Sequence, residues 1–272
     1  MTERRARRVD DRATDFQRTY DTSFAWKTGI AAILCTGGVR GCWPMSSFSG
    51  AGDARDLSGN VQTLSEHDDC LYGIDGLAPY VQFDGDGDYL SRADESTLSI
   101  TGTEIYVADA WKGLSMGCWV YPQEIDSEQA VIGKWNENAV DHRSYLIDLT
   151  AGNVFRARIS QNGQAGTINT VSSTVDVVAD AWYFVSMAFD PSTRLAINVN
   201  GTITETVAGI QADVDDNESE FNVGARDNGA SVYLEGRVSL AWLCAMYHED
   251  GTDPTDHVTQ ALYHHTRALY GR

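Results

Sequence analysis

The two glutamates at positions 124 and 128 are the sharpest catalytic candidates in the sequence. They begin and end the segment Glu124-Ile125-Asp126-Ser127-Glu128. Two glutamates four residues apart on one strand can face one cleft as nucleophile and acid/base, and retaining glycoside hydrolysis needs their carboxyl groups about 5 Å apart. Pro122 and Gln123 end one predicted strand and Gln129 begins the next, so we expect both acids in a hairpin loop. A solvated loop does not raise the pKa of a general acid, which argues against catalysis.

Aspartates at alternate positions form the main metal-binding candidate. Asp84, Asp86 and Asp88 alternate with glycines, and together with Glu95 they have the spacing of the carboxylates at positions 1, 3, 5 and 12 of an EF-hand loop. Position 6 of such a loop is glycine, whereas this sequence has Tyr89 there. We therefore expect either Ca²⁺ ligands in a loop between strands or solvated acids of a glycine-rich turn. The sequence requires no cofactor, and Ca²⁺ is its candidate ion.

Aromatic residues beside polar loops are the candidates for sugar stacking. Carbohydrate binding needs exposed rings near Asn or Asp partners. Trp111, Trp135 with its neighbour Asn136, and Tyr233 meet that requirement in the sequence. Trp111 follows an acidic loop, and Trp135 ends a predicted strand. The alternative role for each ring is packing inside the fold.

An arginine-rich arm begins the chain. Its first 22 residues carry six Arg and five acidic residues with almost nothing apolar, which predicts a mobile or weakly helical segment. Apolar residues that step by about four across residues 15–36 predict a helix that ends near Gly37. The anchoring candidates are Arg4, Arg5, Arg7, Arg8 and Arg12. We expect them to bind an acidic protein surface, and the alternative is that the arm folds back on the acidic body of its own chain.

Charge and composition exclude several classes of protein. The chain has 272 residues, 42% of them hydrophobic, which is enough for a substantial core. Its 20 basic and 39 acidic residues give a net charge of −19, which repels nucleic acid and anionic membranes. Five cysteines without a CxxC motif argue against a zinc site and a disulfide framework, so we expect a reducing compartment. No apolar run reaches the roughly 18 residues of a membrane span or forms a signal peptide.

Short alternating runs separated by Gly, Asn, Asp and Ser follow residue 38 and predict an all-β sandwich. The predicted strands are residues 81–83, 114–121, 130–135, 144–149, 154–160, 181–190, 195–199, 203–207, 220–224 and 234–246. Asn200-Gly201 between two of them is a strong hairpin signal. Residues 256–270 have apolar side chains at helical spacing and predict a short C-terminal helix. Trp119, Trp182 and Trp242 lie in apolar strands, where a large ring can span the roughly 10 Å between two sheets.

Seven short motifs follow one another between residues 38 and 250. They are GCWPM at 41–45 with DLSG at 56–59, VQFDGDGDYL at 81–90, LSMGCWV at 114–120, AWYFVSM at 181–187, LAINVNG at 195–201, FNVG at 221–224 and LEGRV at 234–238. In this order they resemble the laminin-G-like members of the concanavalin A-like lectin/glucanase superfamily. The resemblance implies a two-sheet antiparallel jelly roll. We expect two parts: an arm and docking helix at residues 1–37, and a laminin-G-like jelly-roll domain at 38–272 that ends in a short helix.

The superfamily resemblance leaves the function open, because its members include lectins, glycosidases, adhesion modules and structural appendages. Residues 124–128 resemble the E-x-D-x-E signature of laminarinase-type glycoside hydrolases of this superfamily, but in that signature the acids lie within an apolar strand. Laminin-G-like domains often hold Ca²⁺ with loop carboxylates and backbone carbonyls. No position in this sequence matches a ligand motif closely enough to assign one.

The function we expect is that of a non-enzymatic structural and interaction module. The jelly roll would be displayed by its arm on a capsid-like or tail-like protein surface and would bind cell-surface glycans. A virion or similar particle assembled in the cytoplasm is the expected location, by analogy with bacteriophage-like particles. A stand-alone carbohydrate-binding lectin is the first alternative, and a glycoside hydrolase that uses Glu124 and Glu128 is the second. Clustering as a homo-oligomer would suit a displayed lectin through avidity.

Overall fold

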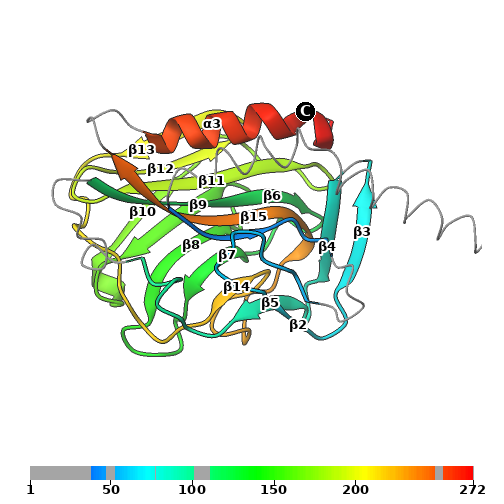
Figure 1. Ribbon diagram of the computed structural model, residues 1–272, viewed down its shortest axis with the longest axis horizontal. Coiled ribbons are helices and arrows are strands. Elements are labelled where there is room, and N and C mark those ends of the chain that lie inside the picture. The colour runs from blue at the N-terminus through cyan, green and yellow to red at the C-terminus, as the bar shows by residue number, and fades with distance from the viewer. Residues whose placement is uncertain (1–37, 47–52, 77, 101–110, 249–253, 272) are drawn as a thin grey trace, which may run out of the picture.

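Two antiparallel β-sheets stacked face to face form the body of the protein (Figure 1). The computed structural model describes residues 38–46, 53–76, 78–100, 111–248 and 254–271. The Arg-rich arm and the helix expected before residue 37 lie outside the described residues. The sheet composition confirms the predicted all-β class and the two-sheet jelly-roll sandwich.

The eight-stranded sheet is the layer that carries the C-terminal helix. Its order is β13 (Thr202–Thr206), β12 (Arg194–Val199), β11 (Tyr183–Asp190), β6 (Trp111–Pro122), β15 (Glu235–His248), β4 (Ala78–Asp84) and β3 (Leu71–Asp75), and β1 (Val39–Trp43) pairs with β15. At the predicted hairpin, Val199 pairs with Thr202. Asn200 and Gly201 take left-handed φ values of 52° and 88°, which a tight two-residue turn requires. The hairpin prediction is therefore confirmed.

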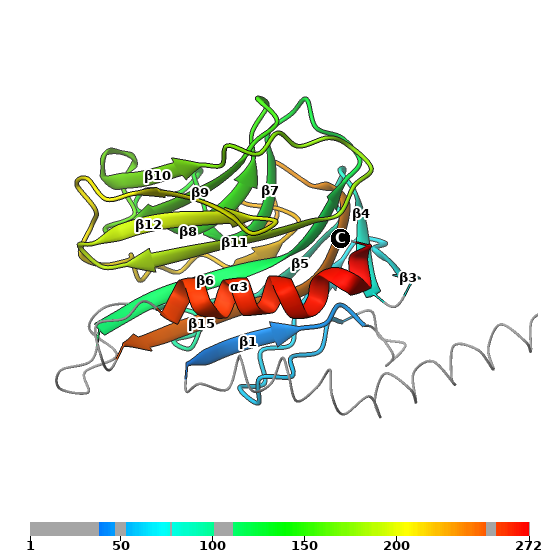
Figure 2. The same ribbon diagram turned by 90° about the horizontal axis from the view of Figure 1, so that it is seen from above.

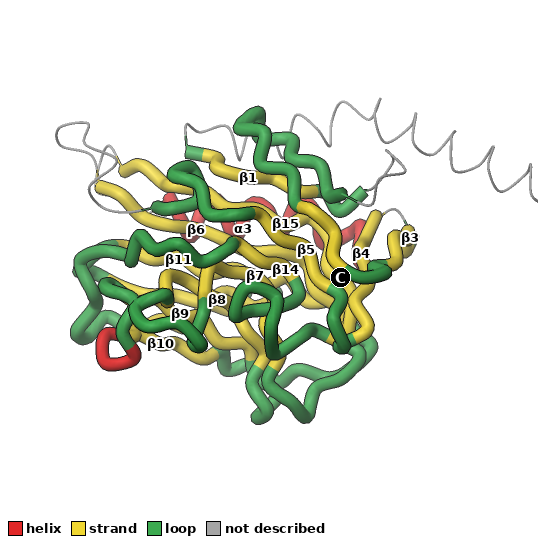
Figure 3. Tube along the Cα trace, turned by 90° about the horizontal axis from the view of Figure 1, so that it is seen from below, coloured by secondary structure: helices red, strands yellow, loops and turns green. Residues whose placement is uncertain are grey.

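The seven-stranded sheet is the second layer. Its order is β10 (Ile168–Ser172), β9 (Phe155–Ser160), β8 (Arg143–Leu149), β7 (Gln129–Trp135), β14 (Phe221–Val223), β5 (Tyr89–Arg92) and β2 (Ser65–His67). A single turn of 3₁₀ helix, η1 (Ala165–Thr167), precedes β10. Figure 3 shows this sheet from the side opposite the C-terminal helix, where the described chain places loops around it.

The main core lies between the two sheets, because side chains at alternate strand positions point inward from both. Along β9, for example, Phe155, Ala157 and Ile159 are buried in this core. Trp43 of β1 also belongs to it and stacks on Phe221 of β14 with ring centroids 5.1 Å apart. Phe155 of β9 and Tyr183 of β11 form another aromatic contact between the layers, with ring centroids 5.7 Å apart.

The C-terminal helix covers a second apolar cluster on the outer face of the eight-stranded sheet (Figure 2). It consists of α3 (Pro254–Thr266) followed by the 3₁₀ turn η2 (Arg267–Tyr270), which confirms the predicted short C-terminal helix. Trp119 donates from Nε1 to Thr266 Oγ1 at 2.9 Å and stacks on Tyr270 at 4.1 Å. Burying this sheet face against the helix removes a large aromatic area from water.

The expectation that three tryptophans span the two sheets is wrong. Trp119, Trp182 and Trp242 all belong to the cluster beneath the C-terminal helix and point away from the core between the sheets. Gly117 makes room for one of them, because a Cβ at this position would lie 2.6 Å from the Trp242 ring. An apolar strand buried on both faces gives no sequence signal for which face a given ring takes.

Among the described residues, no helix has both the length and the apolar character needed to cross a membrane.

Candidate functional site

An ion network lies on the outer face of the seven-stranded sheet. Strand β9 alternates, so that Arg156 and Arg158 point outward while the apolar residues between them face the core. Asp148 of β8 pairs with Arg156 across the strands and is 0% exposed. Arg156 donates to both Asp148 oxygens, at 3.0 Å from Nε and 2.6 Å from Nη2, and Arg158 Nη2 also donates to Oδ2. One fully buried carboxylate therefore holds two guanidinium groups.

Two glutamates, from the loops before and after β7, complete the network. Glu128 Oε1 accepts hydrogen bonds from Arg156 at 2.8 Å, Arg158 at 3.3 Å and Arg226 at 3.0 Å. Glu137 Oε1 accepts from Arg158 Nη1 at 3.1 Å, and Glu137 Oε2 lies 3.4 Å from Arg226 Nη2. The glutamate side chains are 39% and 32% exposed, whereas those of the arginines are 9–23% exposed. The carboxylates are thus the outermost groups, and the arginines lie beneath and brace them.

Trp135 adjoins this network, and its hydrogen bond lowers the pKa of Glu137. The indole donates from Nε1 to Glu137 Oε1 at 3.0 Å, and the Arg158 guanidinium lies 4.8 Å above the ring. Burial alone would raise the pKa of Glu137. The hydrogen bond from Trp135 and the nearby guanidinium groups outweigh burial, so the pKa of Glu137 lies below its usual value. Glu137 is therefore an ionised acceptor at neutral pH.

Two predicted sugar-binding residues, Trp135 and Asn136, are buried at this network. Trp135 is 1% exposed and packs against Ala130 and Leu146 on the outer face of the sheet. Asn136 is 8% exposed, and its Oδ1 accepts hydrogen bonds from the backbone N–H groups of Asn138 at 2.9 Å and Ala139 at 3.2 Å. In this arrangement the ring is covered by Arg158, and the amide orders the loop that carries Glu137.

A buried side-chain amide oxygen without a hydrogen-bond partner lies in strand β14 of the same sheet. Asn222 of β14 is 0% exposed and pairs with Gly133 of β7 and Ser91 of β5. Its Oδ1 has no hydrogen-bond partner in the structure. Buried carbonyl oxygens in proteins almost always accept at least one hydrogen bond. A hydrogen-bond donor to the Asn222 Oδ1 atom would therefore stabilise this part of the sheet.

The third predicted sugar-binding ring, Tyr233, belongs to an aromatic cluster beside the loop that begins at Arg226. Its hydroxyl donates to Gly229 O at 2.6 Å, and its ring lies 6.4 Å from that of Tyr89. Tyr89 in turn stacks on His67 at 4.1 Å with an interplanar angle of 3°, and the His67 Nε2 lies 2.8 Å from Ser91 Oγ. All three rings are half-buried, so they leave partial aromatic surface beside Ser91.

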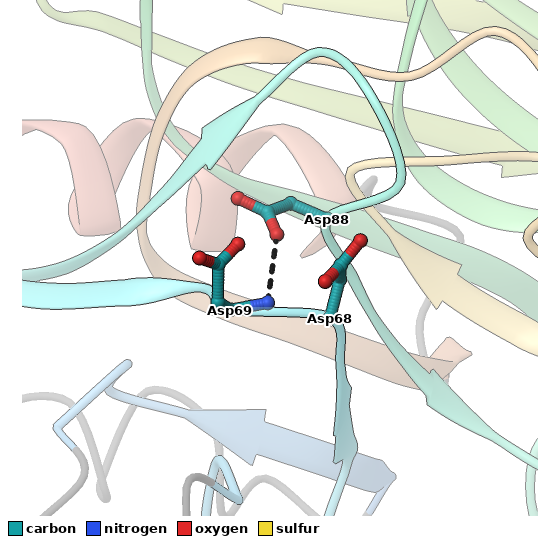
Figure 4. Close-up of side chains that lie close together, drawn as sticks. All are labelled: Asp68, Asp69 and Asp88. Carbon is teal, nitrogen blue, oxygen red and sulfur yellow. Dashed lines mark hydrogen bonds between the residues drawn. The ribbon is translucent and has the colours of Figure 1, made fainter.

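An acidic cluster lies where the loop after β2 meets the loop between β4 and β5 (Figure 4). Carboxylate oxygens of Asp68, Asp69 and Asp88 all lie within 4.8 Å of one another. Asp88 is 3% exposed, and its two oxygens accept from the Asp69 and Asp84 backbone N–H groups, both at 3.1 Å. Burial and the neighbouring Asp84 carboxylate raise the pKa of Asp88. These three side chains offer the oxygen ligands that Ca²⁺ prefers.

Of the predicted metal ligands Asp84, Asp86 and Asp88, only Asp88 belongs to this cluster. Asp84 Oδ1 accepts from the Asp86 backbone N–H at 2.8 Å, which caps their own exposed turn, while Asp88 turns toward Asp68 and Asp69. Beside the cluster, burial and the charges of Asp88 and Glu66 raise the pKa of the Cys70 thiol to about 12. Residues 68–69 meet the 84–88 turn only in the folded chain, so the spacing of acidic residues in the sequence could not predict this contact.

The remaining predicted site residues take separate positions. Glu124 and Glu128 lie in the loop between β6 and β7, as expected, but Glu124 Oε1 accepts from the Asp126 backbone N–H at 2.8 Å while Glu128 joins the arginine network. Trp111 opens β6, and its side chain is outside the described part of the structure. The arm residues Arg4, Arg5, Arg7, Arg8 and Arg12 also lie outside the described residues.

Sequence reasoning missed the basic half of the network. The run Phe155-Arg156-Ala157-Arg158-Ile159 alternates apolar and basic residues, which is the signal for a strand with a charged outer face. Arg226 follows β14 in a loop and carries no comparable signal, because its partners Glu128 and Glu137 are about 90 residues or more away in the sequence.

Comparisons with known proteins agree with this architecture. A family profile, Laminin_G_3, described as the concanavalin A-like lectin/glucanases superfamily, matches residues 84–242. No curated protein matches the chain. Solved structures with the same fold include the botulinum neurotoxin serotype D ligand binding domain in complex with N-acetylneuraminic acid, at a TM-score of 0.62 and 10% identity over 90% of this chain and 56% of that chain.

Two further solved structures are similar to the same degree. The botulinum neurotoxin serotype G binding domain has a TM-score of 0.59 and 10% identity, over 84% of this chain and 51% of that one. The binding domain of Paraclostridial Mosquitocidal Protein 1 has a TM-score of 0.59 and 11% identity, over 86% and 55%. The chain thus spans little more than half the length of these domains, and at such identities the likeness concerns the fold. The profile match covers more than half of the chain, which therefore belongs to the concanavalin A-like lectin/glucanases superfamily.

Proposed function

We propose that this protein is a non-enzymatic carbohydrate-binding module whose ligand lies on the outer face of the seven-stranded sheet. The observation that carries the proposal is the pair of partly exposed carboxylates, Glu128 and Glu137, braced from below by three arginines. Carboxylates accept strong hydrogen bonds from hydroxyl groups, and bracing reduces the entropy lost when a ligand binds. The half-buried rings of Tyr89 and Tyr233 add apolar surface for the C–H faces of a sugar.

The charge arrangement favours a neutral saccharide. Glu128 and Glu137 are more exposed than the arginines that bind them, so an approaching ligand meets negative charge first. A sugar carboxylate would be repelled, whereas neutral hydroxyl groups donate to these oxygens. The neurotoxin domain of the same fold that was solved in complex with N-acetylneuraminic acid binds an acidic sugar, and we therefore expect a different sugar class for this chain.

The hydrogen bonds of the loop between β6 and β7 support a binding role over hydrolysis. Glu128 Oε1 already accepts from three guanidinium groups, whereas Glu124 binds a backbone N–H of its own loop. A retaining hydrolase needs both carboxyl groups directed at one glycosidic bond. The structure places Glu124 and Glu128 in different hydrogen-bond networks.

A glycan array followed by calorimetric titration tests the proposal. We expect a neutral oligosaccharide to bind the wild-type chain, and Glu128→Gln and Glu137→Gln each to weaken binding about tenfold, because each loses a charge-assisted acceptor. Glu205→Gln is the matched control, since Glu205 is 48% exposed and pairs with Arg194 on the other sheet. Blank arrays for the wild-type chain, or equal affinity in all three variants, would contradict the proposal.

We further propose that the module is displayed on a larger protein assembly through its N-terminal arm. The supporting observation is the contrast between six Arg in the first 22 residues and a chain with a net charge of −19. Such an arm suits an acidic groove on a virion or similar particle assembled in the cytoplasm. Gentle lysis of the native source, sedimentation and mass spectrometry test this. Loss of particle association on deletion of residues 1–22 is expected, and unchanged association would overturn the display proposal.

A further inference from the structure

An arginine held between two tyrosine rings lies on the outer face of the eight-stranded sheet, away from the site described above. Arg237 of β15 pairs with Gln82 of β4 and with Tyr121 of β6. Its guanidinium lies 4.7 Å from the Tyr80 ring and 4.9 Å from the Tyr121 ring. Stacking on two aromatic faces fixes the plane of the guanidinium and leaves its N–H groups at the edge of that plane.

The hydrogen-bond donors of this guanidinium are only partly used. Arg237 Nε donates to Gln82 Oε1 at 3.3 Å. Nη1 lies 4.0 Å from Asp75 Oδ2, which is too far for a direct hydrogen bond. The position of Asp75 is set by Trp182, whose Nε1 donates to the same Oδ2 at 2.9 Å. The side chains of Arg237 and Asp75 are 24% and 49% exposed, so a donor and an acceptor face solvent across this gap.

The 4.0 Å gap matches the size of one hydroxyl group. An oxygen about 2.9 Å from both atoms would accept from Arg237 and donate to Asp75, as a bridging water does. A hydroxyl is the ligand group that can do both from a single atom. The rings of Tyr80 and Tyr121, both half-buried, border the gap and offer apolar surface. This combination of features fits a polyhydroxylated ligand.

The surrounding charge indicates that the ligand is neutral. Burial raises the pKa of the Tyr121 hydroxyl, and the exposed Asp180 and Asp75 raise it further, whereas Arg237 lowers it. The positive charge of Arg237, which contacts both tyrosine rings, faces the two negative charges of these carboxylates. An anionic ligand would meet a net negative environment.

We propose that Arg237 and Asp75, bordered by Tyr80 and Tyr121, form a second saccharide-binding site on the eight-stranded sheet. The ligand class rests on the proposed carbohydrate-binding function, but the residues are distinct from those of the first site. Because the outer faces of the two sheets point in opposite directions, two sites allow one chain to contact two glycan strands. Simultaneous contact would increase avidity without changing either affinity.

Two indole N–H groups report on the two sites separately. Trp182 donates to Asp75 of the second site, and Trp135 donates to Glu137 of the first. We would record ¹H–¹⁵N spectra of the full chain and assign these two of its seven tryptophans with Trp182→Phe and Trp135→Phe. The chain is then titrated with lactose, maltotriose and cellotriose at millimolar concentrations. We expect saturable shifts of the Trp182 signal with at least one of the three sugars.

Variants decide whether the Trp182 shift arises at the proposed site. Arg237→Met keeps an unbranched apolar stem between the tyrosines and should weaken the titration of Trp182 at least tenfold, whereas Glu128→Gln should leave it unchanged. Asp75→Asn, at an exposed position, gives a second test that does not depend on how Arg237→Met folds, and should weaken it about threefold or more. A Trp182 signal that stays still while Trp135 shifts, or that shifts equally in Arg237→Met and Asp75→Asn, would overturn the second site alone. If neither signal moves with any sugar, the proposed function fails as well.

Discussion

The ion network and the acidic cluster gather carboxylates in opposite ways. In the network, Asp148, Glu128 and Glu137 are each bound by two or three arginines. In the cluster, no ion pair among the described residues joins Asp68, Asp69 or Asp88 to a basic group. The pKa of Glu137 is accordingly lowered, whereas that of Asp88 is raised by burial and by Asp84.

This contrast shows that the net charge of −19 does not describe either site. Paired charges in the network hold each other in place, which gives a ligand a rigid set of acceptors. Unpaired charges in the cluster repel one another, and a cation or a proton would relieve that repulsion. The two regions should therefore respond differently to mutation, to divalent ions and to pH.

The largest expected effect comes from removing the buried centre of the network. Asp148→Ala leaves Arg156 and Arg158 without their fully buried partner, and breaking a buried pair from one side costs about 3–5 kcal/mol. Chemical denaturation followed by fluorescence measures this loss in the free energy of unfolding.

Glu205→Ala serves as the control for that measurement, because Glu205 is 48% exposed and its pair with Arg194 should contribute less than about 1 kcal/mol. A loss for Asp148→Ala no greater than that of the control would show that the network does not stabilise this face of the sheet.

Calcium should stabilise the acidic cluster by a smaller amount. We expect about 5 mM Ca²⁺ to raise the melting temperature by about 2–4 °C, since binding to the folded state alone stabilises it by mass action. Asp69→Asn should abolish the increase, because Asp69 belongs to the group that lies within 4.8 Å. Asp86→Asn should preserve it, because Asp86 is exposed and caps a separate turn. If Asp86→Asn abolished the increase and Asp69→Asn preserved it, the Ca²⁺ ligands would be Asp84, Asp86 and Asp88, as the sequence spacing predicted. No increase in the wild-type melting temperature would mean that the cluster holds no Ca²⁺.

The smallest effects concern pH and have opposite signs in the network and at Glu66, which lies beside the acidic cluster. Burial and the charge of Asp88 raise the pKa of Glu66 above 4.5, so its contribution to stability is present at low pH and is lost as pH rises through the raised value. Glu137, whose pKa is lowered, contributes stability above pH 4.5 that is lost as pH falls through the lowered value.

At pH 7 we therefore expect Glu66→Gln to stabilise the protein and Glu137→Gln to destabilise it, each by less than about 1 kcal/mol. Thermal unfolding from pH 3 to pH 8 measures both, and the difference between Glu66→Gln and wild type should vanish at the acidic end. Changes of the same sign at pH 7 would remove the electrostatic contrast between the regions.

The overall architecture could be predicted because its signals are local. A tight two-residue turn requires positive φ at two successive residues, which few residue pairs other than Asn-Gly tolerate. The turn at Asn200-Gly201 was found where expected. The C-terminal helix followed from apolar spacing alone. Strands such as β2 (Ser65–His67) escaped prediction because one exposed and two half-buried residues show no period.

The sites could be predicted only in part, because their residues come from distant segments. Glu128 stood out in the sequence as a catalytic candidate, yet its role depends on Arg226, which lies 98 residues later. Trp135 was noticed as an aromatic ring, but only the fold places Arg158 over it. Single residues were therefore found while their partners were missed.

By itself, the amino-acid sequence determined most of the long strands, the Asn200-Gly201 turn, the C-terminal helix and the superfamily, since strand periodicity and turn chemistry act between residues close in the chain. The tertiary structure decided which face each buried tryptophan took and which charges met. Trp119 lies beneath the C-terminal helix instead of between the sheets, and Asp88 faces Asp68 and Asp69. Both outcomes depend on packing and Coulomb energies between segments that meet only after the sheets have assembled.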